Sequence, residues 1–311
     1  MFNIKSQIVL EVKKRTMKIG IDASGGDYGL IATVPGALLA ARKHRHHEVV
    51  LYGKTESILA IAPKRRPKNL MLVDCLHPNE EMRRALTDLK NSWLQTIVSG
   101  IDSSRLSAAI KPHLLRNVPR AGLITSFPTA KGLGYFLDIG ATSEEEDPAV
   151  FFGWAIAGRR FLIDKIGIPE PTFGLLSNAK EKAATAGLKA INDELQRLPG
   201  YQGYIEADEF LKGKVDLWLC NGFHGNLVLK WSEQFASNIL REAVFAVWDS
   251  GAKEQLVKLA KQRYSYEAYL ISPLVGLAVK GQLFRFHGRA DDKQIAQAIG
   301  FAAKAIKGYK S

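Results

Sequence analysis

The chain has 311 residues, of which 46% are hydrophobic, and this is enough to bury the core of one large domain or two modest ones. No apolar run approaches the roughly 20 residues that a membrane-spanning helix needs. The net charge of +12 predicts an acidic partner, which means nucleic acid, anionic lipid or an acidic protein. We expect no nucleic-acid partner, because neither a zinc-finger spacing nor an aromatic-basic RNA-binding motif accompanies the charge.

The N-terminal segment favours a cytoplasmic protein. Residues 1–16 place their charges after a short apolar run, whereas a secretory signal places them before a longer one. Because Met17 follows directly, residues 1–16 are either an extension before an ancestral start or an extra edge strand, and we expect 17–311 to form a single domain. Cys75 and Cys220 make neither a disulfide framework nor a zinc motif, and we expect both to be small buried residues.

Expected strands and helices alternate through most of the chain. The strands cover 18–23, 48–54, 69–74, 121–128, 134–140, 172–178, 201–207 and 214–222. The helices cover 31–43, 56–61 with Thr55 as a cap, 79–99, 147–166, 179–197, 224–248, 252–264 and 291–306. The strands at 121–128 and 134–140 pair around the turn TAKGLG. This order predicts an α/β fold, with a largely parallel sheet covered by helices on both faces.

Four of the expected strands end with Asp or Asn beside glycine or another small residue. They read IDASGGD (21–27), LDIGAT (137–142), LLSNAKE (175–181) and LCNGFHGN (219–226). Glycine lets backbone N–H groups approach an anion closely, and the start of the next helix adds partial positive charge. Since ligands bind beyond the carboxyl ends of parallel strands, we expect a phosphate-handling cleft with these turns on one rim.

Several of these stretches, in order along the chain, resemble the PlsX family, the acyl-phosphate-forming phosphate acyltransferases of bacterial phospholipid synthesis. The matching stretches are KIGIDASGGDYG (18–29), FLDIGAT (136–142), GYIEADEFLKGKVDLWLCNGFHGNLVLK (203–230) and FRFHGRADDKQIAQAI (284–299). The resemblance implies a fold like the isocitrate and isopropylmalate dehydrogenases. It also implies a reaction in which acyl-(acyl carrier protein) and inorganic phosphate give acyl phosphate and free carrier protein.

The resemblance implies a homodimer in the cytoplasm, with peripheral association at the anionic inner face of the membrane. The positive charge agrees with this, because acyl carrier proteins and bacterial membranes are acidic. We expect no cofactor, since the chain lacks the G-x-G-x-x-G of nicotinamide enzymes. We also expect no metal site: RKHRHH (42–47) has no pair of His four residues apart, and its cationic neighbours repel metal ions.

The resemblance implies a set of site residues. As catalytic residues it implies Glu181, Lys182, Asn226 and His287. As phosphate- or substrate-binding residues it implies Asp22, Gly25, Gly26, Asp27, Asp138, Gly140, Asn178, Asn221, Gly222, His224 and Gly225. Structural alternatives stay open for some of them: Asp22 can cap its own turn, and His224 can be an ordinary surface residue.

Three departures from the family pattern leave the activity open. LKNSW (89–93) matches the approach to the family's S-A-G-N-T-G-A loop, but that loop sequence does not follow. The family's lysine near Glu181 falls on Ala183 or Ala184, so Lys180 or Lys182 would have to replace it. Asn221 stands where the family has Asp. The alternatives are therefore an active divergent enzyme, a non-catalytic relative that binds carrier protein, acyl chains or membrane, and a transferase with another acyl donor.

The helical pair expected at 232–264 carries an apolar stripe. Its members are Phe235, Ile239, Leu240, Ala243, Val244, Val247 and Trp248. Core packing or dimer packing is one interpretation of this stripe, and a membrane-surface role is the other.

Overall fold

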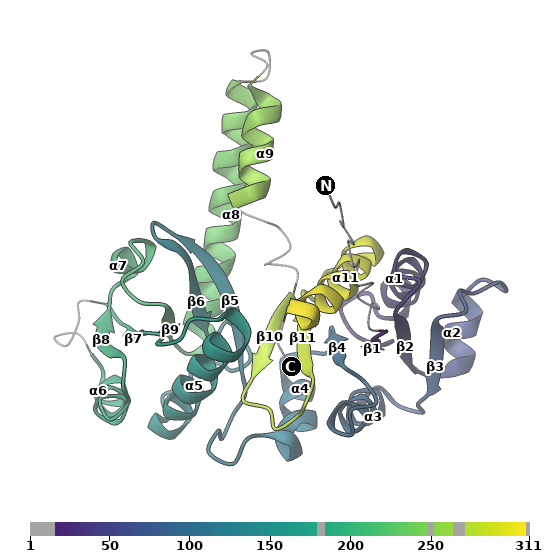
Figure 1. Cartoon of the computed structure of the whole chain (residues 1–311), viewed down its shortest axis with the longest axis horizontal. Helices are drawn as coiled ribbons and strands as arrows, with labels where there is room; N and C mark the ends of the chain where they lie inside the picture. Colours follow the sequence, from purple (N-terminus) through teal and green to yellow (C-terminus); the bar gives the residue numbers. More distant parts are fainter. Residues whose placement is uncertain (1–15, 179–183, 248–251, 264–270, 309–311) are drawn as a thin grey trace, which may run out of the picture.

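A sheet of eleven strands runs through the centre of the molecule in the computed structural model, which describes residues 16–178, 184–247, 252–263 and 271–308 (Figure 1). The strands are β1 (Lys18–Asp22), β2 (Glu48–Gly53), β3 (Leu70–Asp74), β4 (Thr96–Ser99), β5 (Gly122–Thr129), β6 (Gly132–Leu137), β7 (Phe173–Leu176), β8 (Tyr201–Ile205), β9 (Leu217–Leu219), β10 (Ile271–Val275) and β11 (Gln282–Phe286). Their order across the sheet is β3-β2-β1-β4-β11-β10-β5-β6-β9-β7-β8.

Helices cover both faces of this sheet. They are α1 (Leu30–Lys43), α2 (Thr55–Ile61), α3 (Pro78–Lys90), α4 (Ser103–Ile110), η1 (Lys111–His113), α5 (Pro148–Phe161), η2 (Leu162–Ile166), α6 (Ala186–Leu195), α7 (Ala207–Leu211), α8 (Gly222–Ala246), α9 (Lys253–Arg263) and α11 (Asp292–Gly308). Helices α1, α11, α5 and α6 pack on one face of the sheet, and α3, α4, α7 and the first turns of α8 pack on the other. The predicted α/β class with a largely parallel sheet is confirmed.

The sheet consists of two parallel groups that run in opposite directions. The strands β3, β2, β1, β4 and β11 are parallel, and so are β6, β9, β7 and β8. Between them, β10 is antiparallel to β11 and β5, and β5 is antiparallel to β6. The turn after β1 therefore follows a strand of one direction, and the turns after β6, β7 and β9 follow strands of the other. Our expectation of a single rim was wrong for this reason.

The first parallel group is buried on both of its faces, as a sheet between two helix layers must be. Along β2, Val49 and Leu51 pack into the apolar cluster with α1 and α11, whereas Val50 and Tyr52 pack into the cluster with α3. All four side chains are completely buried. Burial on both faces explains why these strands read as continuous apolar runs rather than as alternating patterns.

The largest error of the sequence prediction lies in the segment 79–99, which we expected to be one helix. Helix α3 ends at Lys90, Ser92 adopts a positive φ of 64°, and β4 then forms the middle of the sheet. The strand TIVS is only four residues long and fully buried, so no alternation of apolar and polar residues separated it from the preceding helix. The elements α4, α7, β10 and β11 also had no counterpart in the prediction.

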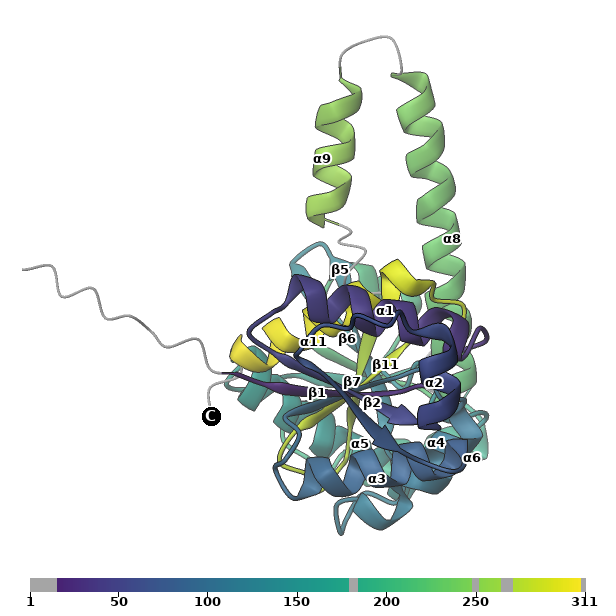
Figure 2. The ribbon, with the colours of Figure 1, turned by 90° about the vertical axis from the view of Figure 1, so that its right-hand side faces the viewer.

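Helices α8 and α9 form an antiparallel pair that projects from the body of the molecule (Figures 1 and 2). On α8, Phe235 is 52% exposed and Ile239 is 49% exposed, so the predicted apolar stripe is not core in this chain. Trp248, the last member of the stripe, lies outside the described residues. Trp231 and Phe235 stack with their ring centroids 5.1 Å apart, and both remain open to solvent.

The described residues form neither a membrane-spanning helix nor a cluster of metal ligands. None of the helices they form combines the length and the apolar composition that crossing a bilayer requires. They also contain no group of three or more His, Cys, Asp or Glu that could hold a metal ion. Both cysteines are buried, as expected.

Candidate functional site

Asp22 closes strand β1 and connects it to β4. Its carboxylate accepts hydrogen bonds from Ser99 Oγ at 3.0 Å and from the backbone N–H of Gly100 at 3.2 Å. A Cβ at Gly25 would overlap this carboxylate, so glycine is required there for the turn to pass so close. Burial, with a smaller contribution from the nearby Glu81, raises the pKa of Asp22 to about 7. Asp22 therefore binds the neighbouring β4 loop as well as closing its own turn.

Gly26 and Asp27 join the same turn to the segment after β11. Gly26 has a φ of 77° and donates its N–H to the carbonyl of Gly100. Asp27 donates its N–H to the carbonyl of Gly288, and its exposed carboxylate lies 3.9 Å from Nε of Arg289. The loops after β1, β4 and β11 thus meet at one place, and His287 belongs to the third of them.

His287 is held as a neutral donor at this meeting point. Burial lowers the pKa of His287, and the nearby cation Lys230 on α8 lowers it further. The ring accepts a hydrogen bond at Nδ1 from the N–H of Arg289 at 3.2 Å. A neutral imidazole that accepts at Nδ1 carries its proton on Nε2. His287 can therefore donate a hydrogen bond to an anionic oxygen or sulfur.

Asp138 organises the second turn from the inside. It is fully buried, and its two oxygens accept hydrogen bonds from the N–H groups of Leu123, Gly140, Ala141 and Thr142 and from the Thr142 hydroxyl. Burial raises the pKa of Asp138, although these hydrogen bonds act in the opposite direction. With its oxygens engaged in this way, Asp138 shapes the turn and points Gly140 outward.

The start of α8 packs directly against this second turn. Gly222 donates its N–H to Thr142 Oγ1 at 3.2 Å, and a Cβ at Gly225 would overlap the carbonyl of Asp138. Asn221 caps the helix by accepting the N–H of His224 at 3.0 Å, and it also contacts His224 Nδ1 at 2.6 Å. The turns 138–142 and 221–226 are therefore brought together as predicted, but their glycines serve the packing of one turn against the other.

Two residues that the sequence analysis missed, Arg285 and Ser103, link the first meeting point to the second turn. Arg285 Nη1 donates to Ser103 Oγ at 2.9 Å and to the Gly140 carbonyl at 3.4 Å. Ser103 Oγ also donates to the Gly140 carbonyl at 3.0 Å. Burial lowers the pKa of Arg285 while Asp138 and Asp102 raise it, and a guanidinium stays charged in any case. Two signals in the sequence could have found Arg285: it is a charged residue inside the strand QLFRF, and it belongs to the matching stretch FRFHGRADDKQIAQAI (284–299).

Arg285 and Asn226 keep binding capacity for a ligand. Among the described residues, Nε and Nη2 of Arg285 have no hydrogen-bond partner, and Arg285 has no carboxylate within 4 Å. Asn226 lies over Gly140: a Cβ at that glycine would be 3.5 Å from Asn226 Cβ. The side-chain amide of Asn226 likewise has no partner in the described ranges. A free guanidinium edge and a free amide next to one carbonyl are donors suited to an oxyanion.

The remaining predicted residues do not join this cluster. Asn178 is exposed after β7, and the structure gives it no contact with the two turns. Glu181 and Lys182 lie outside the described residues. In place of the family's S-A-G-N-T-G-A loop, β4 ends at Ser99 and a short loop from Gly100 leads into helix α4. A strand, a loop and a helix are therefore present there with a different sequence.

Comparison with known proteins identifies the family. The model of one protein family, described as "Fatty acid synthesis protein", matches residues 17–309. The chain belongs to this family. A protein of Aliarcobacter butzleri named phosphate acyltransferase is 28% identical over 93% of each chain. Another of that name, from Sulfurimonas denitrificans, is 29% identical over 94% of this chain and 96% of its own. The resemblance to the PlsX phosphate acyltransferases is therefore confirmed.

Solved structures show the same fold at low sequence identity. A branched-chain phosphotransacylase from Enterococcus faecalis superposes with a TM-score of 0.60 at 12% identity, covering 94% of this chain and all of its own. A 4-hydroxythreonine-4-phosphate dehydrogenase from Burkholderia phymatum reaches a TM-score of 0.53 at 13% identity, covering 94% of this chain and 98% of its own. These likenesses establish the architecture and leave the chemistry to be argued from the site.

Proposed function

We propose that this protein is a phosphate acyltransferase of phospholipid synthesis, which uses acyl-(acyl carrier protein) and inorganic phosphate to form acyl phosphate. The names of its relatives support this activity and do not favour the non-catalytic alternative. The observation that carries the proposal is the guanidinium edge of Arg285, which has no partner in the described part of the chain and lies near the likewise unpartnered amide of Asn226 and the neutral donor His287.

The reaction needs positioning and charge stabilisation, and it needs no covalent enzyme intermediate. A phosphate oxygen attacks the thioester carbonyl carbon, a tetrahedral oxyanion forms, and the carbon–sulfur bond then breaks to release the carrier thiolate. In our proposal Arg285 and Asn226 bind the phosphate, and Nε2–H of His287 donates to the developing negative charge. The thiolate takes its proton from solvent.

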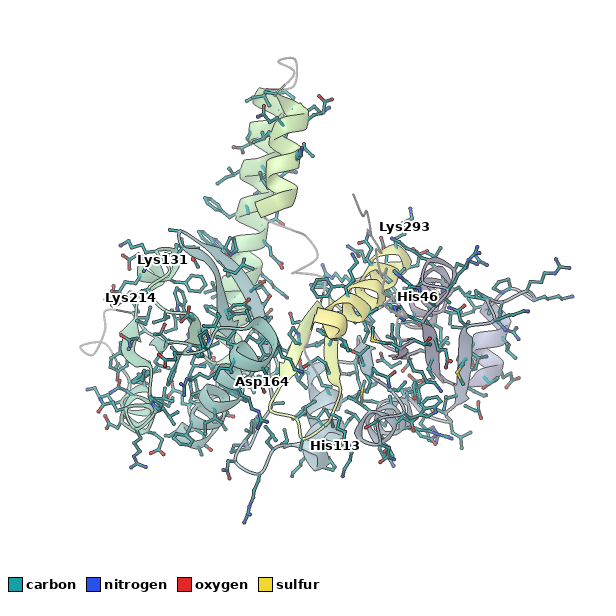
Figure 3. The ribbon with its side chains drawn as sticks, in the orientation of Figure 1. His46, His113, Lys131, Asp164, Lys214 and Lys293 are labelled. Atoms are coloured by element: carbon teal, nitrogen blue, oxygen red, sulfur yellow. The ribbon has the colours of Figure 1, made fainter. Side chains whose placement is uncertain are left out.

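We further propose that the working protein is a homodimer that binds acyl carrier protein and anionic membrane. The support for the dimer is an apolar row on α8, formed by Phe223, Leu227, Trp231, Phe235 and Ile239. These side chains recur every four residues and are each about half exposed or more, so a second chain could cover them. The support for acidic partners is the net charge of +12, with basic side chains at both ends of the molecule, from Lys131 and Lys214 to Lys293 (Figure 3).

The first experiment is a product assay. Purified protein is incubated with palmitoyl-(acyl carrier protein) and phosphate, and acyl phosphate is trapped with hydroxylamine. We expect phosphate-dependent product in the wild type, and a loss on the order of 100-fold in kcat/KM for Arg285→Ala and Asn226→Ala. The matched control is Arg289→Ala, which removes an exposed arginine four positions along the chain and keeps activity. A wild type that binds carrier protein but forms no acyl phosphate would contradict the proposal.

A further inference from the structure

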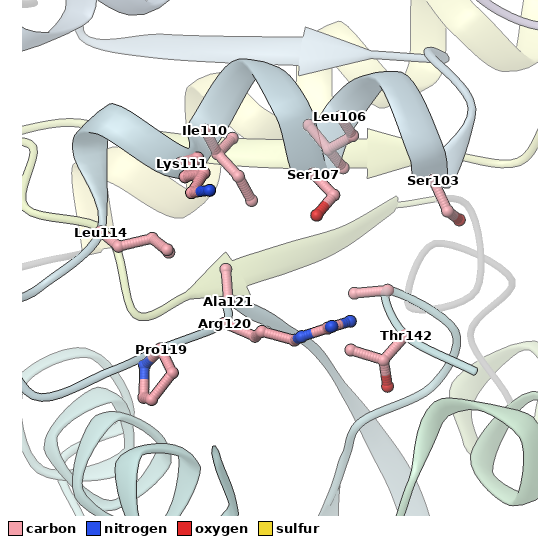
Figure 4. A pocket seen from close by; sticks show the side chains of 11 residues that line it. Ser103, Leu106, Ser107, Ile110, Lys111, Leu114, Pro119, Arg120, Ala121 and Thr142 are labelled. Carbon is pink, nitrogen blue, oxygen red and sulfur yellow. The ribbon is translucent and has the colours of Figure 1, made fainter. Parts of the chain in front are cut away.

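A pocket of about 290 Å³ opens between α4 and the segment that leads into β5 (Figure 4). This volume is at the lower end of the range of about 300–1,000 Å³ that small-molecule sites usually have. One wall is α4 with its continuation into η1, and the other wall is formed by 119–121 and the turn at 141–142. Nothing in the mechanism proposed above uses the length of this pocket.

The α4 wall carries two chemically different rows of side chains. Leu106, Ile110 and Leu114 recur every four residues and form an apolar row. Ser103, Ser107 and Lys111 recur with the same spacing and form a polar row that ends in a cation. Because residues four apart lie on one helix face, the two rows run side by side for about 12 Å. The opposite wall adds Pro119, Ala121 and Ala141 to the apolar side.

One end of the pocket belongs to the candidate active site. Ser103 lines the pocket and also binds Arg285 and the Gly140 carbonyl. Thr142 lines the same end and is held by Asp138. At the other end stands Lys111, which is exposed and has no carboxylate within 4 Å among the described residues. Arg120 also lines the pocket, and it is paired with Glu145 at 3.1 Å. The pocket therefore runs from Lys111 to the place where the thioester would react in the proposed function.

We propose that this pocket binds the phosphopantetheine arm of the acyl donor, an inference that rests on the proposed function. The arm is a long chain with a phosphate at one end, amides and methyl groups along its length, and the thioester at the other end. Lys111 binds the phosphate, the hydroxyl of Ser107 binds an amide, and the apolar row packs against the methyl and methylene groups. Ser103, whose proton goes to the Gly140 carbonyl, can accept one further hydrogen bond from an amide N–H. A pure hydrocarbon chain would give Ser107 and Lys111 no polar partner, which disfavours an acyl-chain pocket.

The direct test measures binding without turnover. Free 4′-phosphopantetheine is titrated into the protein by calorimetry, together with dephosphorylated pantetheine. We expect Ser107→Trp, which fills the pocket, to weaken binding of both by about tenfold or more. Lys111→Ala should weaken the phosphorylated ligand alone, so that the two affinities converge. Ala108→Trp is the matched control, because Ala108 is exposed on α4 and does not line the pocket.

The turnover test separates this inference from the proposed function. The same acyl group is supplied on phosphopantetheine and on N-acetylcysteamine, which lacks the outer part of the arm. Ser107→Trp should lower kcat/KM about tenfold for the long donor and much less for the short one. Equal effects on both donors, or wild-type binding of phosphopantetheine by Ser107→Trp, would overturn the pocket assignment. Wild-type protein that binds the arm but forms no acyl phosphate would instead overturn the proposed function.

Discussion

Single residues in this site owe their properties to burial and to their hydrogen-bond partners. Asp22 and Asp138 are both buried carboxyl groups at the end of a strand. The oxygens of both accept hydrogen bonds from neighbouring backbone N–H and hydroxyl groups. Arg285, which the sequence analysis did not single out, keeps donors without a partner among the described residues at the centre of the cluster. In the proposed site the ligand is therefore bound by Arg285, and Asp22 and Asp138 of the glycine-rich turns hold the loops in place.

The raised pKa of Asp22 makes a prediction about stability. With a pKa of about 7 in the folded state and 3.8 in the unfolded state, Asp22 holds its proton more tightly when folded. The free energy of unfolding should therefore fall as the pH rises from about 4 to about 7. Asp22→Asn, which cannot ionise, should remove this contribution, which amounts to at most about 4 kcal/mol.

The measurement is denaturant unfolding of both proteins at a series of pH values. The matched control is Asp27→Asn, which removes an exposed carboxylate from the same turn and should keep the wild-type pH dependence. Parallel curves for the wild type and Asp22→Asn would refute the role assigned to Asp22.

The N-terminus of α8 packs against the turn at 138–142. It is therefore not the open helix end that the sequence suggested for binding an anion. The N-terminus of α8 has its first N–H groups bound by Thr142, Ser143 and Asn221. The helix start therefore fixes the turn that carries Gly140, and Gly140 in turn fixes Arg285 and Ser103. Its partial positive charge still favours an anion nearby.

Gly225→Ala tests the contact between these two turns. Alanine is the better helix former by about 1 kcal/mol, so an unconstrained site would be stabilised. Here its Cβ would overlap the carbonyl of Asp138, and we expect a loss of stability of about 2 kcal/mol. Thermal unfolding measures the effect. A rise in the melting temperature would show that the two turns are not packed as described.

The projecting pair α8–α9 makes a prediction about assembly. In the proposed homodimer, a charge at Trp231 would be buried against the partner, so Trp231→Glu should shift the protein from dimer to monomer. Ser237→Glu introduces the same charge on a different side of α8 and should leave the dimer intact. Light scattering after size-exclusion chromatography gives the mass. A wild-type monomer, or a dimer that survives Trp231→Glu, would count against the proposed interface.

The whole molecule is a positively charged body whose expected substrate is carried by an acidic protein. Because the protein has a net charge of +12, its association with acyl carrier protein should be steered electrostatically, and added salt should weaken this association. The sheet sets the shape of this body. Its two parallel groups are joined by the antiparallel strands β10 and β5, and the site lies where loops from both groups meet.

Salt dependence tests this charge at the scale of the molecule. Between about 0.05 and about 0.3 M sodium chloride, kcat/KM for the acyl carrier protein donor should fall several-fold. With acyl-N-acetylcysteamine, an uncharged donor, the fall in kcat/KM should be much smaller. Both assays contain phosphate, so an effect of salt on phosphate binding would appear equally in both. Equal salt dependence for the two donors would show that the charge acts on phosphate rather than on the carrier protein.

The sequence by itself determined the family and the α/β class. Local patterns are sufficient for these, because apolar periodicity, glycine turns and ordered motifs are properties of short stretches. Only the tertiary structure placed β4 inside the sheet, between β1 and β11, and set the opposite direction of the second strand group. It alone brought Arg285 to Ser103, which is 182 residues away in the chain, and to the carbonyl of Gly140. Contacts over such distances depend on how the whole sheet is ordered, and no local pattern in this chain encodes that order.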